Sequence, residues 1–98
     1  MTNINIDYMN LSVIIPVYNA ASFVTQAVES ALAQPETTEV ILIEDGSQDS
    51  SLEVCQALSV KYEKVCLLRH PGGMNRGAGA SRNLGMKHAQ NDYIAFLD

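Results

Sequence analysis

Two patterns of apolar residues alternate along this chain. Continuous apolar runs, rich in β-branched residues, occupy residues 11–17, 39–44, 65–68 and 93–97. Runs of this length between turn residues are typical of strands, and the unbroken first and last runs are typical of buried strands. The pattern therefore predicts four strands, at least two of which lie inside a layered fold.

Helical spacing fills the intervals between these runs. Val24, Val28 and Leu32 belong to an apolar stripe with the three- and four-residue spacing of a helix. Ser22 is the predicted N-cap of this helix, and Pro35 is expected to close it.

A second helix is expected to begin at Ser50 and to end near Lys61. Ser50 and Glu53 have the spacing of a capping box, in which each side chain accepts a hydrogen bond from the backbone N–H of the other residue. Cys55, Leu58 and Tyr62 are the residues that this helix should turn inward.

The third helix, predicted at residues 80–89, follows a loop at residues 70–79 that holds four of the six glycines. Cys55 and Cys66 have neither CxxC nor metal-ligand spacing, and we expect both to be buried thiols.

Strands and helices in this order predict an α/β fold: a Rossmann-like, three-layer α/β/α domain with a mainly parallel sheet of about four strands. Residues 11–98 would form it, with residues 1–10 as a disordered or extended lead-in. If the fourth strand lies beside the first, on the side opposite the second, a crevice opens at the carboxyl ends of the strands. Tyr18, Asp45 and Asp98 would border that crevice.

Composition narrows the choice of partners. The formal charge of −5 argues against a nucleic-acid backbone or an anionic membrane as the main partner, and the apolar fraction of 47% argues for a globular chain. No apolar stretch approaches the ~18 residues of a membrane span. The two cysteines, read as buried thiols, indicate a reduced, cytoplasmic setting. Peripheral attachment to the inner face of the membrane is the alternative for a longer, full-length protein.

Asp45 and Tyr18 follow two of the predicted strands and have two interpretations each. Asp45 precedes Gly46 and could be an ordinary turn residue, although Ser47 and Asp49 already provide capping groups there. Its carboxylate could instead accept a hydrogen bond from the imide N–H of a uracil-like base. Tyr18 could stack on the same ring or be an ordinary strand-end aromatic.

The glycine-rich segment from Gly72 to Asn83 fits no standard phosphate loop. Gly77 and Gly79 lack the third glycine of a dinucleotide fingerprint, and no Gly-Lys-Ser/Thr of a Walker loop is present. Backbone N–H groups and Arg82 at a helix start would make an anion site, whereas a flexible connection is the simpler interpretation.

Together these segments resemble the inverting glycosyltransferases of family 2, which have the GT-A fold. The resemblance rests on residues 12–19 (SVIIPVYN), 28–34 (VESALAQ), 39–50 (EVILIEDGSQDS), 77–85 (GAGASRNLG) and 93–98 (YIAFLD). It implies an enzyme that moves a sugar, with inversion, from a nucleotide-diphosphate sugar, most often a UDP-sugar. The acceptor, whether glycan, lipid or protein, is not identified.

The resemblance also assigns roles to single residues. Pro16, Val17 and Tyr18 would surround the base, while Asp45 would accept a hydrogen bond from the uracil. A departure from the family is Glu44, where an Asp is common; it preserves the charge.

The remaining roles concern the diphosphate and a metal. Gly77 and Arg82 would lie near the phosphates. Asp98 matches the first acid of an Asp-x-Asp motif, which would serve the ribose and a Mg²⁺ or Mn²⁺ ion. The second acid, the catalytic base and the acceptor half would lie beyond residue 98, so we expect weak UDP binding without sugar transfer from these 98 residues.

Two other functions would each need a feature that this sequence lacks. A sugar nucleotidyltransferase would need a basic, glycine-rich loop after the first strand, and the segment from Tyr18 to Ser22 has no basic residue. A non-catalytic, flavodoxin-like or receiver module would need a second acid after the first strand and a lysine after a later one, and neither is present.

Overall fold

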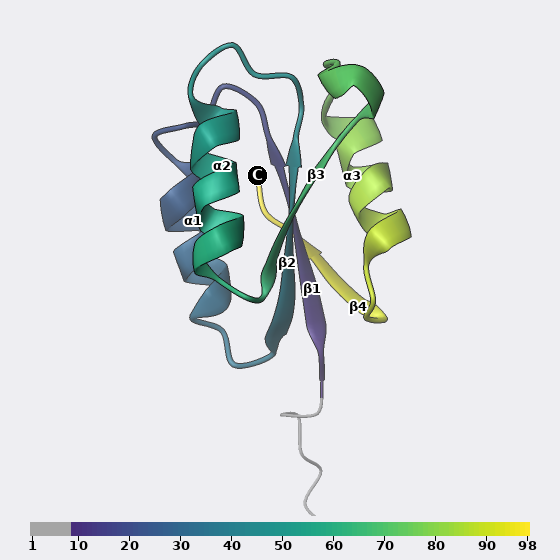
Figure 1. Cartoon of the computed structure of the whole chain (residues 1–98). Helices are drawn as coiled ribbons and strands as arrows, with labels where there is room; N and C mark the ends of the chain where they lie inside the picture. The colour runs from purple at the N-terminus through teal and green to yellow at the C-terminus, as the bar shows by residue number, and fades with distance from the viewer. Residues whose placement is uncertain (1–8) are drawn as a thin grey trace, which may run out of the picture.

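The computed structural model describes residues 9–98. The predicted lead-in at residues 1–10 lies outside the described residues except for Met9 and Asn10, which have no regular secondary structure. From residue 11 onward the chain folds into one layered unit (Figure 1).

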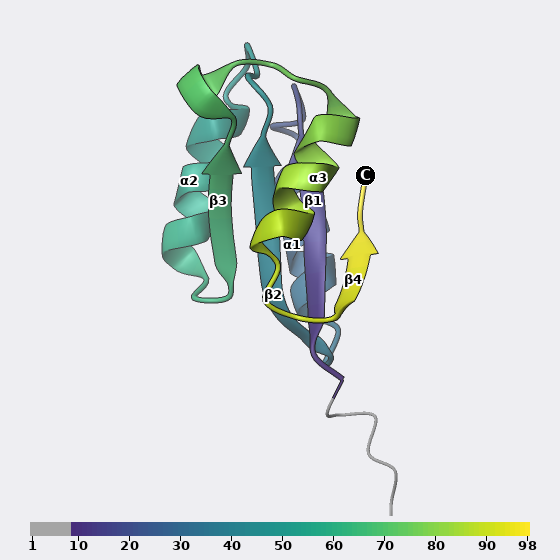
Figure 2. The ribbon, with the colours of Figure 1, turned by 90° about the vertical axis from the view of Figure 1, so that its right-hand side faces the viewer.

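The sheet confirms the predicted topology. Its four strands are all parallel and lie in the order β3-β2-β1-β4, as Figure 2 shows. The strands are β1 (Leu11–Val17), β2 (Thr37–Glu44), β3 (Val65–Arg69) and β4 (Tyr93–Phe96). Because β4 pairs with β1 on the side away from β2, the crevice predicted at their carboxyl ends is present.

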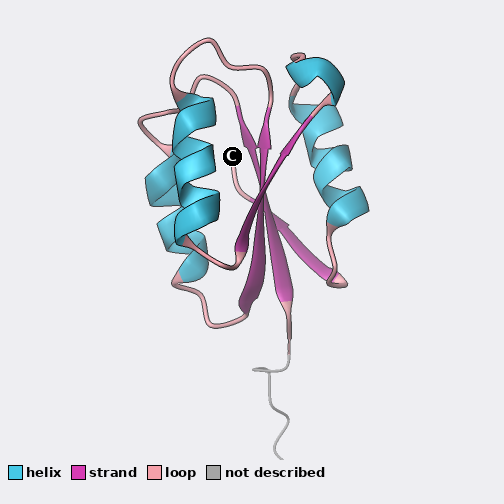
Figure 3. Cartoon of the chain, in the orientation of Figure 1, coloured by secondary structure: helices cyan, strands magenta, loops and turns pink. Residues whose placement is uncertain are grey.

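Helices cover both faces of this sheet. On one face lie α1 (Val24–Leu32) and α2 (Ser51–Lys61), and on the other lies α3 (Ala78–His88), as Figures 1 and 3 show. A short 3₁₀ turn, Pro71–Gly73, interrupts the loop before α3. The structure is thus the predicted three-layer α/β/α fold.

Strand alternation divides the core into two clusters. Val13, Ile15 and Val17 point toward α1 and α2, while Ile14 points to the opposite cluster, beneath α3. On α3, Gly85 lets the helix approach closely, since a Cβ at Gly85 would lie 2.5 Å from Cγ2 of Ile14. The glycine therefore sets how deeply α3 sits on the sheet.

The outer strands are less buried than their sequence indicated. Tyr93 and Phe96 of β4 are exposed, and only the central strands β1 and β2 are almost fully covered. Cys55 is buried as predicted, but Cys66 is exposed, so that prediction was wrong. The reason is that β3 is an edge strand, and the side chain of Cys66 projects from a part of the sheet that α3 does not cover.

Several element boundaries differ from those predicted. The N-cap of α1 is Phe23 rather than Ser22, and its amide donates to the Ala20 carbonyl in a turn that precedes the helix. Ser50 is the N-cap of α2 but makes no side-chain capping bond; Oδ1 of Asp49 accepts from the Ser51 amide instead. The capping-box prediction was therefore wrong, because an acid one residue earlier already satisfies the helix start.

The other differences are small. Strand β2 begins two residues earlier than predicted and β3 ends at Arg69, one residue later than predicted. Helix α3 spans Ala78–His88 rather than 80–89, and β4 ends at Phe96. Such shifts of one or two residues do not move any element to a different layer.

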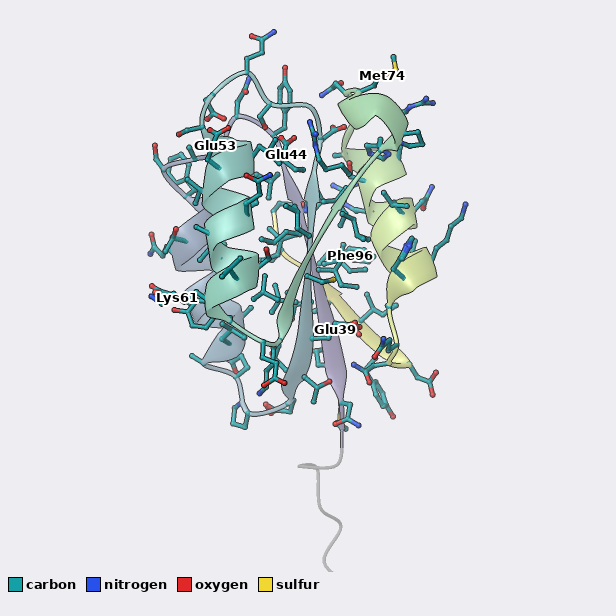
Figure 4. The ribbon with its side chains drawn as sticks, viewed as in Figure 1. Glu39, Glu44, Glu53, Lys61, Met74 and Phe96 are labelled. Atoms are coloured by element: carbon teal, nitrogen blue, oxygen red, sulfur yellow. The ribbon has the colours of Figure 1, made fainter. Side chains whose placement is uncertain are left out.

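A polar cluster at the amino ends of the strands holds β4 beside β1. Oε1 of Glu39 accepts from the Ser12 hydroxyl at 2.6 Å and from the Gln90 amide at 2.9 Å. The Asn91 side chain donates to the Ser12 hydroxyl at 3.0 Å. Figure 4 shows Glu39 at this lower end of the sheet and Glu44 at the upper end, where the carboxyl ends lie. By anchoring the start of β4, the cluster fixes where Asp98 emerges.

Candidate functional site

A cavity of about 540 Å³ lies at the carboxyl ends of β1, β2 and β4. The residues that line it are Pro16, Tyr18, Ala20, Asp45, Asn75, Gly77, Ala78, Arg82 and Asp98. Its volume falls within the ~300–1,000 Å³ usual for small-molecule sites. The lining comes from four separate chain segments, so the cavity exists only in the folded chain.

Of the residues that the sequence indicated, Val17 alone does not line the cavity. Its side chain is buried in the core, and its carbonyl accepts from the Asp45 amide at 2.8 Å. Sequence reasoning missed Ala20, Asn75 and Ala78. Asn75 and Ala78 fall in or beside the glycine-rich loop, whose course over the β2 end could not be deduced from local signals.

Asp45 is almost fully buried, and its carboxylate joins the end of β2 to the loop before α3. Oδ1 accepts from the Arg76 amide at 2.7 Å, and Oδ2 accepts from the Gly77 amide at 3.0 Å. The Asn75 side chain donates to Oδ2 at 3.3 Å and to the Asp45 carbonyl at 2.8 Å. The carboxylate therefore shapes the wall of the cavity that the loop provides.

Gly46 makes room for the same loop. It has φ +70, and a Cβ there would lie 2.7 Å from the backbone nitrogen of Asn75. A left-handed conformation and this close approach both require glycine. Asp45 and Gly46 together position the loop, Asp45 through its carboxylate and Gly46 through the room it leaves.

Glu44 stabilises the segment after β2 from the other side. Its carboxylate is fully buried and accepts from the Gly46 amide at 3.2 Å and the Ser47 amide at 2.8 Å. Nε of Arg69 on the neighbouring β3 lies 3.4 Å from Oε1 of Glu44. Because the charge is both hydrogen-bonded and paired, its burial is tolerated.

The loop after β1 is joined to the loop after β2. Asn19, with φ 49, accepts from the Gln48 amide at 2.8 Å through its side-chain oxygen, and its own amide donates to the Ser47 hydroxyl at 2.9 Å. Asp49 accepts from the Ala21 amide at 3.2 Å. These bonds fix the backbone on which the half-exposed Tyr18 presents its ring to the cavity.

The surroundings of Asp49 also lower the pKa of its carboxyl group. Hydrogen bonding with Ser51 lowers the pKa of its carboxyl, although partial desolvation opposes the shift. Asp49 therefore stays charged at neutral pH, where it stabilises the start of α2.

Arg82 and Asp98 both line the cavity and form an ion pair there. Nη2 of Arg82 on α3 lies 3.5 Å from Oδ1 of Asp98, and the two side chains are 37% and 73% exposed. Helix α3 begins at Ala78, with Gly77 as its N-cap, and both residues line the cavity. A helix N-terminus and a guanidinium at one wall favour a negatively charged ligand group.

Comparison with known proteins decides the family. The sequence profile described as Glycosyl transferase family 2 matches residues 12–98, which is most of the chain. The chain belongs to glycosyl transferase family 2. Family membership leaves no reason to retain the nucleotidyltransferase or the receiver-module interpretation.

Curated relatives are family 2 glycosyltransferases and are longer than this chain. An uncharacterised glycosyltransferase of Haemophilus influenzae is 44% identical over 89 residues, which are 90% of this chain and 35% of that protein. A poly(ribitol-phosphate) beta-glucosyltransferase of Bacillus spizizenii is 36% identical over 93 residues, 92% of this chain and 14% of that protein. The chain therefore spans about a third or less of the length of these two family 2 relatives.

Solved structures show the same fold. A mannosyltransferase of Pyrobaculum calidifontis, in complex with GDP-Man and Mn²⁺, superposes with a TM-score of 0.74 at 19% identity, over 87% of this chain and 26% of that one. TarS of S. aureus gives a TM-score of 0.69 at 26% identity, over 92% of this chain and 16% of that one. This family 2 chain has the fold of GT-A glycosyltransferases.

Of the two carboxylates that line the cavity, Asp45 is held by the loop, and Asp98 is the one that a divalent metal could reach. Asp98 offers carboxylate oxygens, the donor type that Mg²⁺ and Mn²⁺ prefer. Among residues 9–98, however, no three His, Cys, Asp or Glu side chains gather into a group that could hold a metal. The described part of this family 2 chain therefore holds no complete metal site.

Within the same residues, none of the helices is both long and apolar enough to cross a membrane.

Proposed function

We propose that this chain binds the nucleotide of a nucleotide-diphosphate sugar, and that the glycosyltransferase activity of its family uses a UDP-linked donor with inversion at the anomeric carbon. The observation that carries the proposal is one cavity lined by Tyr18, Asp45, Arg82 and Asp98. These residues combine an aromatic face, hydrogen-bond acceptors and a cation, which are the groups that a base, a ribose and a diphosphate require.

The base would lie between the β1 and β2 ends. Tyr18 is half exposed and can stack on a ring, and Pro16 supplies an apolar wall. An ionised carboxylate has about four acceptor sites. That of Asp45 accepts three hydrogen bonds from the loop, donated by Asn75, Arg76 and Gly77. Because His70 Nε2 lies 3.5 Å from Oδ1, a uracil imide N–H would have to displace the longer Asn75 contact to Oδ2 at 3.3 Å.

The diphosphate would lie toward α3. Gly77, the first turn of α3 and Arg82 form that wall of the cavity, so the phosphate oxygens would meet backbone N–H groups and a guanidinium. Binding there would draw Arg82 from Asp98, because the phosphates offer it a stronger partner than an exposed carboxylate.

Asp98 would then be free to bind the ribose or to serve as one ligand of Mg²⁺ or Mn²⁺. When bound, such an ion supplies positive charge to the leaving diphosphate. The P. calidifontis neighbour was solved with Mn²⁺ and GDP-Man, and its shared fold supports placing the donor at this edge of the sheet.

Transfer also needs a base that takes a proton from the acceptor hydroxyl. Among the described residues, the carboxylate of Asp45 is occupied by the loop and Asp98 is assigned to the donor, so we expect nucleotide binding without sugar transfer by the 98 residues. The acceptor would be a glycan, a lipid or a protein. The acceptor and the location, cytoplasmic or at the inner membrane, are properties of the whole enzyme and are not tested with these residues. Binding of the donor alone is therefore the testable part.

The decisive experiment is a calorimetric titration of the 98-residue chain with UDP, GDP and dTDP, each with and without Mn²⁺. We expect saturable binding with UDP preferred and only a modest effect of Mn²⁺. An Arg82→Ala variant should bind about tenfold more weakly, the usual loss for one charge-assisted hydrogen bond. Lys87→Ala, on the exposed last turn of the same helix, is the matched control.

The Arg82 variant is informative because its ion pair with Asp98 is largely exposed and should add less than about 1 kcal/mol to folding stability. If Arg82→Ala weakens nucleotide binding without changing the free energy of unfolding, the loss comes from the binding site and not from destabilisation of the fold. The absence of binding to all three nucleotides by a folded chain would refute the proposal for these residues. Equal binding of UDP and GDP would refute the assignment of the donor base.

A further inference from the structure

A buried histidine lies directly behind the cavity wall. His70 follows β3 and is 7% exposed. Its ring makes polar contacts with residues of two other chain segments. Its Nε2 lies 3.0 Å from the hydroxyl oxygen of Ser81 on α3 and 3.5 Å from Oδ1 of Asp45 after β2. The ring therefore bridges the two walls that would hold the base and the diphosphate.

This group is not a Ser-His-Asp nucleophile. In such a triad the serine and the aspartate contact different ring nitrogens, whereas Ser81 and Asp45 both contact Nε2 of His70. Ser81 is also completely buried, so no substrate can reach its hydroxyl. The contact must act through structure and not through attack on a substrate.

The position of the proton follows from the two oxygens. A proton on Nε2 lets His70 donate to the Ser81 hydroxyl and places a polar N–H 3.5 Å from the Asp45 carboxylate. A bare Nε2 would turn its lone pair toward that carboxylate, which is unfavourable at 3.5 Å. Since the Ser81 hydroxyl can either accept or donate, the Asp45 carboxylate is the neighbour that favours a hydrogen on Nε2.

The same carboxylate oxygen that faces His70 also accepts the Arg76 amide at 2.7 Å. A shift in the rotamer of Asp45 would therefore break the bonds to Arg76 and Gly77 and release the loop. Ser81 belongs to the first turn of α3, where its amide donates to the Gly77 carbonyl at 3.1 Å. His70 thus touches both ends of the loop's attachment.

We propose that His70 is a positioning residue: its Nε2–H holds the Asp45 carboxylate and the first turn of α3 in the arrangement that binds the nucleotide. This inference rests on the proposed function for its effect on affinity. Its effect on the loop is independent of any ligand.

The test compares two polar replacements of similar character. In His70→Gln the side-chain amide nitrogen reaches the position of Nε2, whereas in His70→Asn it reaches only that of Nδ1. Ser81→Ala removes the second partner. His88→Gln, at the exposed end of α3, is the matched control.

Two readouts are measured on the 98-residue chain. The first is the proton chemical shift of the Arg76 and Gly77 amides without ligand, which reports their bonds to Asp45. The second is the dissociation constant for UDP. We expect His70→Asn to move both amide shifts and to weaken UDP binding about tenfold, while His70→Gln stays within about threefold of the wild type. His88→Gln should change neither.

The outcomes are separable. If Asn and Gln variants that are both folded give the same amide shifts as the wild type, His70 does not position the loop and the inference fails. The inference also fails if the Asn and Gln variants change the Arg76 and Gly77 amide shifts equally. The size of the imidazole ring, and not a donor at the Nε2 position, would then explain the effect. If the wild type binds no nucleotide, the proposed function fails, and the amide shifts alone still decide the role of His70.

Discussion

Asp45 and Arg76 lie 31 residues apart in the sequence, yet Oδ1 of Asp45 accepts the backbone N–H of Arg76 at 2.7 Å. This bond and its neighbour to Gly77 place the glycine-rich loop over the end of β2. A single carboxylate thus determines the shape of one cavity wall.

Replacing Asp45 with Asn should therefore destabilise the fold as well as the site. The amide side chain keeps the shape but turns an N–H toward a backbone N–H, so at least one of the two bonds is lost. We expect the free energy of unfolding in urea to fall by about 2 kcal/mol, the usual range for hydrogen bonds to a charged group. Glu53→Gln, on the exposed face of α2, is the control and should change it by less than about 0.5 kcal/mol. Equal stability of the two variants would contradict the role given to Asp45.

Gly46 and Gly72 offer a matched test of the loop's close approach. Their φ angles are +70 and +71, but only at Gly46 would a Cβ meet backbone, 2.7 Å from the Asn75 nitrogen; at Gly72 the nearest atom is a Met74 side-chain carbon at 3.7 Å. Gly72→Ala should cost only the left-handed strain of about 1–2 kcal/mol. Gly46→Ala should lower the free energy of unfolding, measured by heat or urea, by more than Gly72→Ala does. It should also shift the Arg76 and Gly77 amide resonances. Similar losses for both variants would show that the loop can move away without penalty.

Two glycines of α3 should respond to alanine in opposite directions. A Cβ at Gly85 would lie 2.5 Å from Ile14 Cγ2 and 3.0 Å from Ile43 Cδ1, whereas nothing lies within 4 Å of a Cβ at Gly79. Gly85→Ala should lower the free energy of unfolding by about 1–3 kcal/mol through overpacking. Gly79→Ala should raise it by about 0.5 kcal/mol, because alanine restricts the unfolded chain and favours helix. A Gly85→Ala variant as stable as the wild type would mean that α3 can lift from the sheet.

The two cysteines should differ in reactivity. Cys55 is completely buried, and burial, together with the charges of Glu44 and Asp49, raises the pKa of its thiol to about 12. Cys66 lies in the edge strand β3 and is exposed, although partial burial and Glu39 raise the pKa of its thiol too. A thiol reagent at neutral pH should modify Cys66 first and Cys55 only on unfolding. Mass spectrometry of the labelled chain would show the order, and simultaneous labelling would contradict it.

Cys55 also predicts a pH dependence of stability. Its thiol has a pKa near 9.0 when unfolded and about 12 when folded, so between these values the unfolded chain releases the proton and the folded chain keeps it. The free energy of unfolding should therefore decrease as the pH rises from about 9 to about 12. The decrease should be smaller in Cys55→Ala, which isolates this thiol from the other groups that titrate there. An identical slope in both proteins would contradict the assignment.

Local signals in the sequence were sufficient for most of the fold. The apolar runs at 11–17 and 39–44 predicted the central strands because both faces of these strands are covered and nearly every residue must be apolar. The same reasoning overstated the burial of Cys66 and Phe96, since a short apolar run does not reveal that its strand lies at an edge. Edge and centre are properties of strand order, which no single segment encodes.

The sequence by itself determined the order of elements, the family and the residues at the carboxyl ends of β1, β2 and β4, because periodicity and motif spacing are local properties. Only the tertiary structure decided that the Asp45 carboxylate is occupied by the Arg76 and Gly77 amides and that His70 lies behind it. Those contacts join segments about thirty residues apart, whose meeting depends on how α3 packs on Ile14 and on the room that Gly46 leaves. Contacts of this kind arise from the packing of whole elements, and for that reason they leave no local pattern in the chain.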